Sequence, residues 1–143
     1  MTKELTFTPI NQDDIKFLFE SYLEYVEYLN SINEKTEFPT FDSHEKFVNK
    51  FLQDKDNHDY EYWYILYLDD EKIGNFNIKK NKEFGYQIIK KYQSKGIGTQ
   101  AFEKFFQKYP KESIWARTKP KNIKSQKILK KFGFKLTEYE FHC

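Results

Sequence analysis

The stretch "YQSKGIGTQAF", residues 92–102, decides the fold because it joins an apolar segment that predicts a strand to a segment with helical spacing. It places Gly96 and Gly98, two of only five glycines in the chain, one residue apart at the start of the predicted helix. The first N–H groups of a helix have no intrahelical partner and carry the positive end of the helix dipole. Residues without a Cβ let this backbone approach an anion closely, so the stretch predicts a phosphate-binding loop.

Gln93, Gly96 and Gly98 spell the pattern Q-x-x-G-x-G, which is a weak motif on its own. It is not the Walker sequence, because no G-K-[ST] follows it. It does not match the dinucleotide fingerprint either, since it has two glycines rather than three and opens no evident β-α-β unit of parallel strands. A plain strand-to-helix turn explains these three residues equally well.

Hydrophobic spacing places the other elements on both sides of this loop. Alternating or β-rich runs predict strands at 4–10, 61–68, 72–78, 83–89, 113–118 and 134–142. Apolar stripes at helical spacing predict helices at 12–29, 43–52, 97–108 and 119–132. The order β-α-α-β-β-β-α-β-α-β indicates a single domain over 1–143 of the α/β (α+β) class, with a mixed, mostly antiparallel central sheet flanked by about four helices.

The first two predicted helices carry local signals at their starts and on their apolar faces. Asn11 is the expected N-cap of the first helix, and Asp42 or Ser43 is that of the second. Tyr22 and Tyr25 fall on the apolar stripe of the first helix. Their spacing therefore predicts that both tyrosines lie in the core.

Charge is divided unevenly along the chain. Residues 1–71 carry 6 lysines and 17 acidic residues, a net charge of −11, whereas residues 72–143 carry 18 basic and 5 acidic residues, a net charge of +13. This asymmetry indicates an anionic partner for the second half and a cationic one for the first. Two solvated surfaces are the alternative interpretation.

Composition also limits the compartment and the chemistry. The chain has no apolar run of about 20 residues and no signal-peptide h-region, so we expect no membrane contact and a cytoplasmic location. Cys143 is the only cysteine, which excludes an intramolecular disulfide. The three histidines have no ligand spacing, and we therefore expect no metal.

Two longer segments resemble one known family. Residues 83–106, "EFGYQIIKKYQSKGIGTQAFEKFF", are similar to the acyl-coenzyme-A-binding strand, loop and helix of the GNAT superfamily of N-acetyltransferases, whose hallmark is [QR]-x-x-G-x-[GA]. Residues 122–134, "NIKSQKILKKFGF", resemble the late helix of that superfamily, closest in style to its ribosomal-protein-type enzymes. The resemblance covers nearly the whole chain and is weakest before residue 60. It implies acetyl-CoA as co-substrate.

The resemblance also implies which residues hold the cofactor. Backbone groups of Ile88 and Ile89 would pair with the pantetheine amides, Asn122 would bond to the pantetheine arm, and Ser125 would lie near the sulfur. The pyrophosphate would be held by the backbone amides of the glycine loop. These amides belong to Gln93, Ser94, Lys95, Gly96, Ile97, Gly98 and Thr99.

The catalytic groups follow the family less closely. Many relatives carry a general-acid tyrosine seven residues after the late-helix asparagine, where this chain has Leu129. Ser125 is the substitute that the resemblance implies, although a serine bonded to its own helix backbone is an equally good interpretation. Tyr86 is a candidate for the acceptor pocket, with a core position as its alternative. Four carboxylates remain open as the base: Glu20, Glu24, Glu27 and Glu83.

The sequence therefore predicts acetyl-CoA-dependent transfer of an acetyl group to a primary amine by direct attack on the thioester. The expected acceptor is a small-molecule or peptide amine: a polyamine, an aminoglycoside, an amino sugar or a protein N-terminus. We expect no nucleic-acid partner and a monomer or homodimer. A basic RNA-binding module and a GNAT-fold cofactor binder without catalysis are the alternatives.

Overall fold

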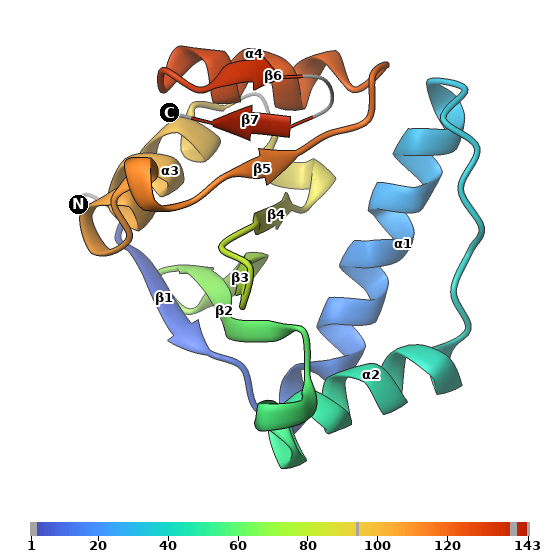
Figure 1. The fold of residues 1–143 in the computed structure, drawn as a ribbon. Helices are drawn as coiled ribbons and strands as arrows, with labels where there is room; N and C mark the ends of the chain where they lie inside the picture. The colour runs from blue at the N-terminus through green and yellow to red at the C-terminus, as the bar shows by residue number, and fades with distance from the viewer. Residues whose placement is uncertain (1–2, 94, 138–139, 143) are drawn as a thin grey trace.

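The computed structural model describes residues 3–93, 95–137 and 140–142 (Figure 1). The strands are β1 (Leu5–Pro9), β2 (Tyr60–Leu68), β3 (Glu71–Lys79), β4 (Phe84–Ile88), β5 (Ala116–Arg117), β6 (Lys135–Thr137) and β7 (Glu140–His142). The longer helices are α1 (Ile15–Ser31), α2 (Phe41–Gln53), α3 (Ile97–Lys108) and α4 (Ile123–Lys131). Short 3-10 turns are η1 (Gln12–Asp14), η2 (Lys55–Asn57), η3 (Lys90–Tyr92) and η4 (Lys111–Ser113). No helix in these ranges is long and apolar enough to cross a membrane.

Four strands form an antiparallel sheet in the order β1-β2-β3-β4. The predicted meander is confirmed, and Phe76 lies opposite Tyr86 while Gly74 lies opposite Ile88. Gly74 has a packing reason, because a Cβ there would come within 2.3 Å of the Gln87 carbonyl oxygen. The central strand β3 is therefore held close to β4.

The end of the chain differs from the prediction of one strand over 134–142. It forms a hairpin of β6 and β7, and β7 also pairs with β5 to give a second sheet in the order β5-β7-β6. The two-residue β5 offers few backbone partners to a long strand. A hairpin instead pairs β7 on both edges, which satisfies more of its N–H and C=O groups.

The two sheets meet at one short parallel contact between β4 and β5. The Phe84 N–H donates to the Trp115 carbonyl at 2.8 Å, and the Trp115 N–H donates to the Lys82 carbonyl at 3.1 Å. The segment β4-α3-β5 is thus a parallel β-α-β unit, which the sequence analysis missed because β5 is so short. No ladder pair joins β4 to β5 beyond this contact among the described residues, so the two strands separate there.

Two cores lie on opposite faces of the four-stranded sheet. On the α3 face, Phe76, Phe84, Phe102 and Phe105 are at most 2% exposed. An RNA-binding module would need aromatic side chains exposed beside its lysines. Phe102 and Phe105 are buried instead, so they cannot stack on bases. On the α1 and α2 face, the second core contains Leu18, Val48, Trp63 and Ile65 among others.

Capping side chains determine where the helices begin. Asn11 forms a capping box with Asp14 at the turn that leads into α1, as predicted. The second helix is capped by Thr40, whose hydroxyl accepts the Ser43 N–H at 3.1 Å, and not by Asp42 or Ser43. The last long helix begins only after Asn122, because that side chain is its N-cap.

Candidate functional site

A cleft of about 1040 Å³ lies where β4 and β5 diverge. Its lining comes from α1 and α2 on one side, from α3 and α4 on the other, and from β2, β3 and β4 at its base. Single small-molecule sites usually measure about 300 to 1,000 Å³. The cleft therefore lies at the upper end of this range, which suits a large, elongated ligand.

The edge of β4 that faces the cleft has open backbone groups. The Ile89 N–H donates to the Ile73 carbonyl at 2.9 Å, so residues at odd positions of this segment bond to β3. Tyr86 and Ile88 alternate with them and point their N–H and C=O groups away from β3. The Ile88 carbonyl accepts the Gln93 side-chain amide at 2.7 Å. Ile88 thus lies on the open edge as expected, whereas the amide of Ile89 is used within the sheet.

The first turn of α3 brings a second set of free backbone groups to the cleft. Gly96 is the N-cap with a φ of 78°, a left-handed conformation that favours glycine. Intrahelical bonding begins with the Gln100 N–H, which donates to the Gly96 carbonyl. The N–H groups of Ile97, Gly98 and Thr99 have no partner among the described residues. They form the anion-binding end that the glycines predict.

Gly98 has a packing role that the motif did not reveal. A Cβ there would lie 3.4 Å from Ile128 Cδ1 and 3.6 Å from Ile88 Cδ1. Gly98 is therefore the point where α3 closes on β4 and α4. By contrast, a Cβ on Gly96 would meet no atom within 4 Å.

Lysines of α4 add positive charge beside the α3 N-terminus. Lys124, Lys127 and Lys131 share the face of α4 that lines the cleft. The Lys131 ammonium donates to the Thr99 hydroxyl at 3.2 Å. The arrangement suits a ligand with several phosphates.

Two described residues of the predicted loop, Lys95 and Ile97, do not line the cleft. Lys95 is exposed and its ammonium lies 5.9 Å from the Tyr92 ring centroid. Ile97 packs its side chain against the α3 core, so only its backbone is available. Ser94 lies outside the described residues.

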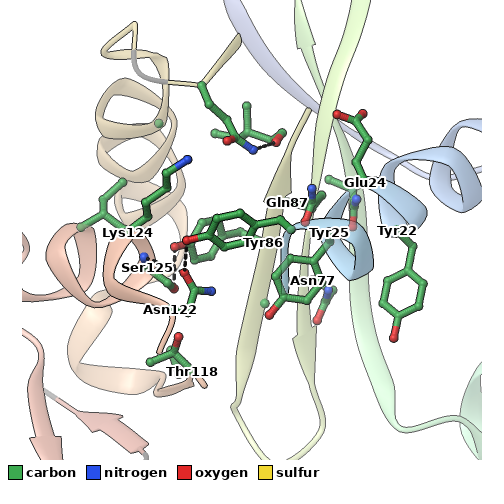
Figure 2. A pocket seen from close by; sticks show the side chains of 18 of the residues that line it. Tyr22, Glu24, Tyr25, Asn77, Tyr86, Gln87, Thr118, Asn122, Lys124 and Ser125 are labelled. Atoms are coloured by element: carbon green, nitrogen blue, oxygen red, sulfur yellow. Dashed lines mark hydrogen bonds between the residues drawn. The ribbon is translucent and has the colours of Figure 1, made fainter. Parts of the chain in front are cut away.

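Tyr86 and Ser125 meet at the centre of the cleft. The Tyr86 hydroxyl and the Ser125 Oγ are 2.8 Å apart, and Figure 2 shows the two side chains pointing toward each other. The Tyr86 ring is fixed by an edge contact with Phe102 at 4.7 Å. Burial raises the pKa of Tyr86, so the phenol stays protonated at neutral pH.

Neutral polar groups surround this pair. Asn122 is 4% exposed, and its Oδ1 accepts the Ser125 N–H at 3.3 Å and the Tyr28 hydroxyl at 3.4 Å. The buried Thr118 Oγ1 has no hydrogen-bond partner in the described structure. Leu129 is fully buried in the core. At the position where the resemblance implies a tyrosine in many relatives, this chain therefore has a buried apolar side chain.

The other end of the cleft is a chamber of neutral side chains, which we call the aromatic chamber. Its walls are five rings from α1, α2 and β2: Tyr22, His44, Phe47, Tyr60 and Trp63. Its floor consists of three side-chain amides from β3 and β4: Asn75, Asn77 and Gln87. Tyr22 is 40% exposed and stacks on the His44 ring at 6.3 Å, so its predicted core position is wrong.

Tyr25 is also not the core residue that its spacing predicted. It lines the cleft. Burial is the main cause that raises the pKa of its phenol, and the neighbouring Tyr22 raises it further. Tyr22, Tyr25 and Tyr28 recur every three residues on α1 and all line the cleft. This tyrosine repeat was the signal in the sequence that pointed to a site rather than to the core.

The structure separates the four candidate bases. Glu20 is an exposed partner of Lys16, and Glu83 lies beside Lys79 at 3.5 Å. Neither lines the cleft. Glu24 and Glu27 do line it. The Glu24 carboxylate accepts the Lys90 N–H at 2.9 Å.

Comparisons with known proteins agree with this geometry. A family model described as an acetyltransferase (GNAT) domain matches residues 4–135. No curated protein sequence matches the chain. An acetyltransferase from Thermus thermophilus is similar in structure, with a TM-score of 0.72 and 19% identity over 96% of this chain and 94% of that one.

Two further solved structures have acceptors in their names. A RimL ribosomal L7/L12 α-N-protein acetyltransferase in complex with coenzyme A has a TM-score of 0.71 and 17% identity over 96% of this chain and 82% of that one. A spermidine N-acetyltransferase chimera, from Vibrio cholerae and hSSAT, has a TM-score of 0.71 and 19% identity over 93% and 81%. At these identities the likeness shows the fold alone.

Proposed function

The chain belongs to the acetyltransferase (GNAT) domain family, and on that premise we propose that it transfers the acetyl group of acetyl-CoA to a primary amine. The observation that carries the proposal is the meeting of two sets of free backbone groups in one cleft. The open edge of β4 at Tyr86 and Ile88 lies beside the unpaired N–H groups that begin α3.

The described residues fit coenzyme A along the path from the open edge of β4 to the N–H groups that begin α3. The amides of the pantetheine arm would pair with the open edge of β4, and the pyrophosphate would accept the N–H groups of Ile97, Gly98 and Thr99. Lys124 and Lys131 flank the same place and would neutralise further phosphate charge. The acyl group would then lie near Ser125.

Bound acetyl-CoA supplies an activated acetyl group as a thioester. The amine nitrogen forms a bond to the acetyl carbon, the carbon–sulfur bond breaks, one proton leaves the nitrogen and one reaches the sulfur. A backbone N–H on the open edge of β4 that the pantetheine arm does not use would stabilise negative charge on the acetyl oxygen. No acyl group is passed to the protein in this direct transfer.

We assign to Ser125 the role of hydrogen-bond donor to the departing sulfur. Because the Tyr86 phenol stays protonated, it can donate its hydrogen to the Ser125 Oγ across their 2.8 Å contact. The hydrogen of Ser125 is then free to be donated into the cleft. A hydroxyl held in this way donates a hydrogen bond that stabilises the departing thiolate. The proton that the amine loses reaches the sulfur through this hydrogen-bonded contact or through water, and Ser125 is unchanged at the end of the step.

The amine must lose a proton before it attacks. A lysine-like amine with a pKa of about 10.4 costs about 4.6 kcal/mol to neutralise at pH 7. Among the lining residues that the structure describes, Glu24 and Glu27 are the carboxylates that could accept this proton directly or through water.

Calorimetry with acetyl-CoA, followed by thiol release with a panel of amines, tests the proposal. We expect binding of acetyl-CoA and release of one thiol per acetylated amine. Failure to bind acetyl-CoA would contradict the proposed function. Binding without turnover on any amine would instead support a cofactor binder without catalysis.

A further inference from the structure

None of the eight side chains that define the aromatic chamber is an aspartate, a glutamate, a lysine or an arginine. Of the 17 acidic residues in 1–71, only Glu24 and Glu27 line the cleft, and no lysine of that half lines it. Burial also lowers the pKa of His44, so this ring is neutral at pH 7. A ligand with several ammonium groups would lose its hydration in the chamber without enough opposite charge in return. The acidity of the first half therefore does not describe the chamber.

The chamber has more hydrogen-bonding groups than the protein uses. Asn77 is 9% exposed, and its amide makes no hydrogen bond among the described residues. The Asn75 Oδ1 accepts the Trp63 indole N–H at 3.1 Å, which leaves the Asn75 NH₂ group as a donor. The Nε2 atom of His44 is buried without a partner in the part of the chain that the structure describes. Buried polar groups of this kind are usually satisfied, so the free ones indicate a polar ligand.

The floor of the chamber has the width of one small ring. Asn75 lies directly opposite Gln87 in the sheet, and Asn77 lies opposite Gly85. Opposite residues are about 5 Å apart and alternate residues of a strand about 7 Å. The Asn77 amide lies over Gly85, where a Cβ would approach it within 3.2 Å. The three amides thus form one compact patch, in which Gly85 makes room for the side chain of Asn77.

The walls beside this polar floor are aromatic, and their rings pack on one another edge to face. The rings of Tyr60 and Trp63 are 4.8 Å apart, and Phe47 lies 5.3 Å from Tyr60. Aromatic faces attract the slightly positive C–H groups of a ring that lies on them. Neighbouring hydroxyl groups on such a ring both donate and accept, as does each side-chain amide.

Given the proposed acetyl transfer, on which this step rests, we propose that the aromatic chamber is the acceptor subsite and that its ligand is an amino sugar. The hydroxyl groups would bond to Asn75, Asn77 and Gln87, and the C–H face would lie against the rings. The primary amine would point toward the open edge of β4. A polyamine lacks the hydroxyls, and an extended peptide presents its N–H and C=O groups to opposite sides.

The test compares three classes of amine with the full chain at saturating acetyl-CoA. The amino sugars are glucosamine and galactosamine, the polyamine is spermidine, and the peptide has a free α-amine and no lysine. Thiol release gives kcat/KM for each amine, and calorimetry gives the Kd of acetyl-CoA. We expect one of the amino sugars to exceed both spermidine and the peptide at least tenfold in kcat/KM.

Two variants at one position test the role of the floor. Asn77→Leu keeps the approximate shape but removes the amide, and should raise the KM of the preferred amino sugar at least tenfold while the Kd of acetyl-CoA stays unchanged. Asn77→Asp adds a charge, and should shift the preference from the amino sugar toward spermidine. Gln107→Leu is the control, because Gln107 is an exposed amide on α3 that does not line the cleft.

Each outcome decides the inference. A higher kcat/KM for spermidine or for the peptide overturns it while leaving acetyl transfer intact, and so does an unchanged KM in a folded Asn77→Leu variant. If Asn77→Leu does not fold, an unchanged preference in Asn77→Asp overturns it. Absence of acetyl-CoA binding would instead mark the failure of the proposed function itself.

Discussion

The two ends of the cleft are built from different parts of the chain. The cofactor end uses mainly backbone groups, namely the N–H groups that begin α3 and the open edge of β4. The aromatic chamber uses side chains that come from α1, α2 and three strands. A backbone site depends on the path of the chain and tolerates many side-chain changes, whereas a side-chain site can be altered one residue at a time. The two ends should therefore respond differently to substitution.

The largest expected effect is at Gly98, where a side chain would block the backbone site. Gly98→Leu should weaken acetyl-CoA binding more than about 100-fold, because the added atoms must displace Ile88 or Ile128 or enter the cleft. Gly98→Ala is the matched control and should bind with a much smaller loss, since its Cβ would make contacts close to ordinary distances. Calorimetry measures both Kd values, and circular dichroism checks folding. A folded Gly98→Leu protein with normal affinity would refute the backbone site.

The next effect concerns Ser125 and Tyr86, which act between the two ends. Ser125→Ala should lower kcat about tenfold to 100-fold, as expected for loss of a hydrogen-bond donor to the departing thiolate, with little change in the Kd of acetyl-CoA. Tyr86→Phe removes only the hydroxyl that holds Ser125 and should lower kcat less. Steady-state thiol release measures kcat, and thermal unfolding shows whether the Tyr86 packing is retained.

The double variant shows whether these two hydroxyls act as one unit. If Tyr86 works through Ser125, then Ser125→Ala with Tyr86→Phe should be no slower than Ser125→Ala alone. Multiplied losses in kcat would show that the two residues act independently. Equal losses of kcat and acetyl-CoA affinity would indicate a structural role only.

The contrast between the two ends also explains what the sequence could predict. Most of the cofactor end lies in the continuous segment 83–106, which contains Gly96 and Gly98. Asn122 begins a second segment, 122–134, and the resemblance rests on the order of these two segments. The antiparallel meander was predicted because alternation of apolar residues reports directly on a strand with two faces. The fold class therefore followed from local patterns.

The chamber could not be predicted in this way, because its residues are scattered over distant elements. Tyr22 falls on an apolar stripe, and an aromatic ring has the same spacing whether it faces a core or a cavity. Its neighbour His44 has no motif at all. The parallel contact of β5 and the hairpin of β6 and β7 depend on pairing between distant segments, which single-strand patterns do not report.

His58 makes the chamber wall sensitive to pH. Its Nδ1 accepts the Tyr60 N–H at 2.9 Å and its Nε2 donates to the Phe47 carbonyl at 3.2 Å, so the neutral ring joins two wall residues. Burial lowers the pKa of His58, and burial also lowers the pKa of His44. As the pH falls below about 6.5, the unfolded chain takes up protons that the folded protein resists, and the free energy of unfolding decreases.

Thermal unfolding between pH 7.5 and 5.5 tests whether His58 makes the stability of the protein depend on pH. The Tm of the wild-type protein should fall as the pH is lowered, and His58→Gln should show a weaker dependence because the titrating ring is gone. His44→Gln is the matched comparison and should remove less of the slope, since no hydrogen bond of the described structure involves that ring. An unchanged slope in His58→Gln would show that the wall does not titrate.

The smallest effect is expected for the exposed charges at the cofactor end. Lys131 lines the cleft and bonds to Thr99, whereas its neighbour Lys130 is also exposed but does not line it. Lys131→Gln should weaken acetyl-CoA binding about twofold to fivefold at low salt, and this loss should shrink as salt screens the phosphates. Lys130→Gln should leave the Kd unchanged. Equal losses in both variants would mean that the net charge of the second half, rather than a phosphate contact at Lys131, attracts the cofactor.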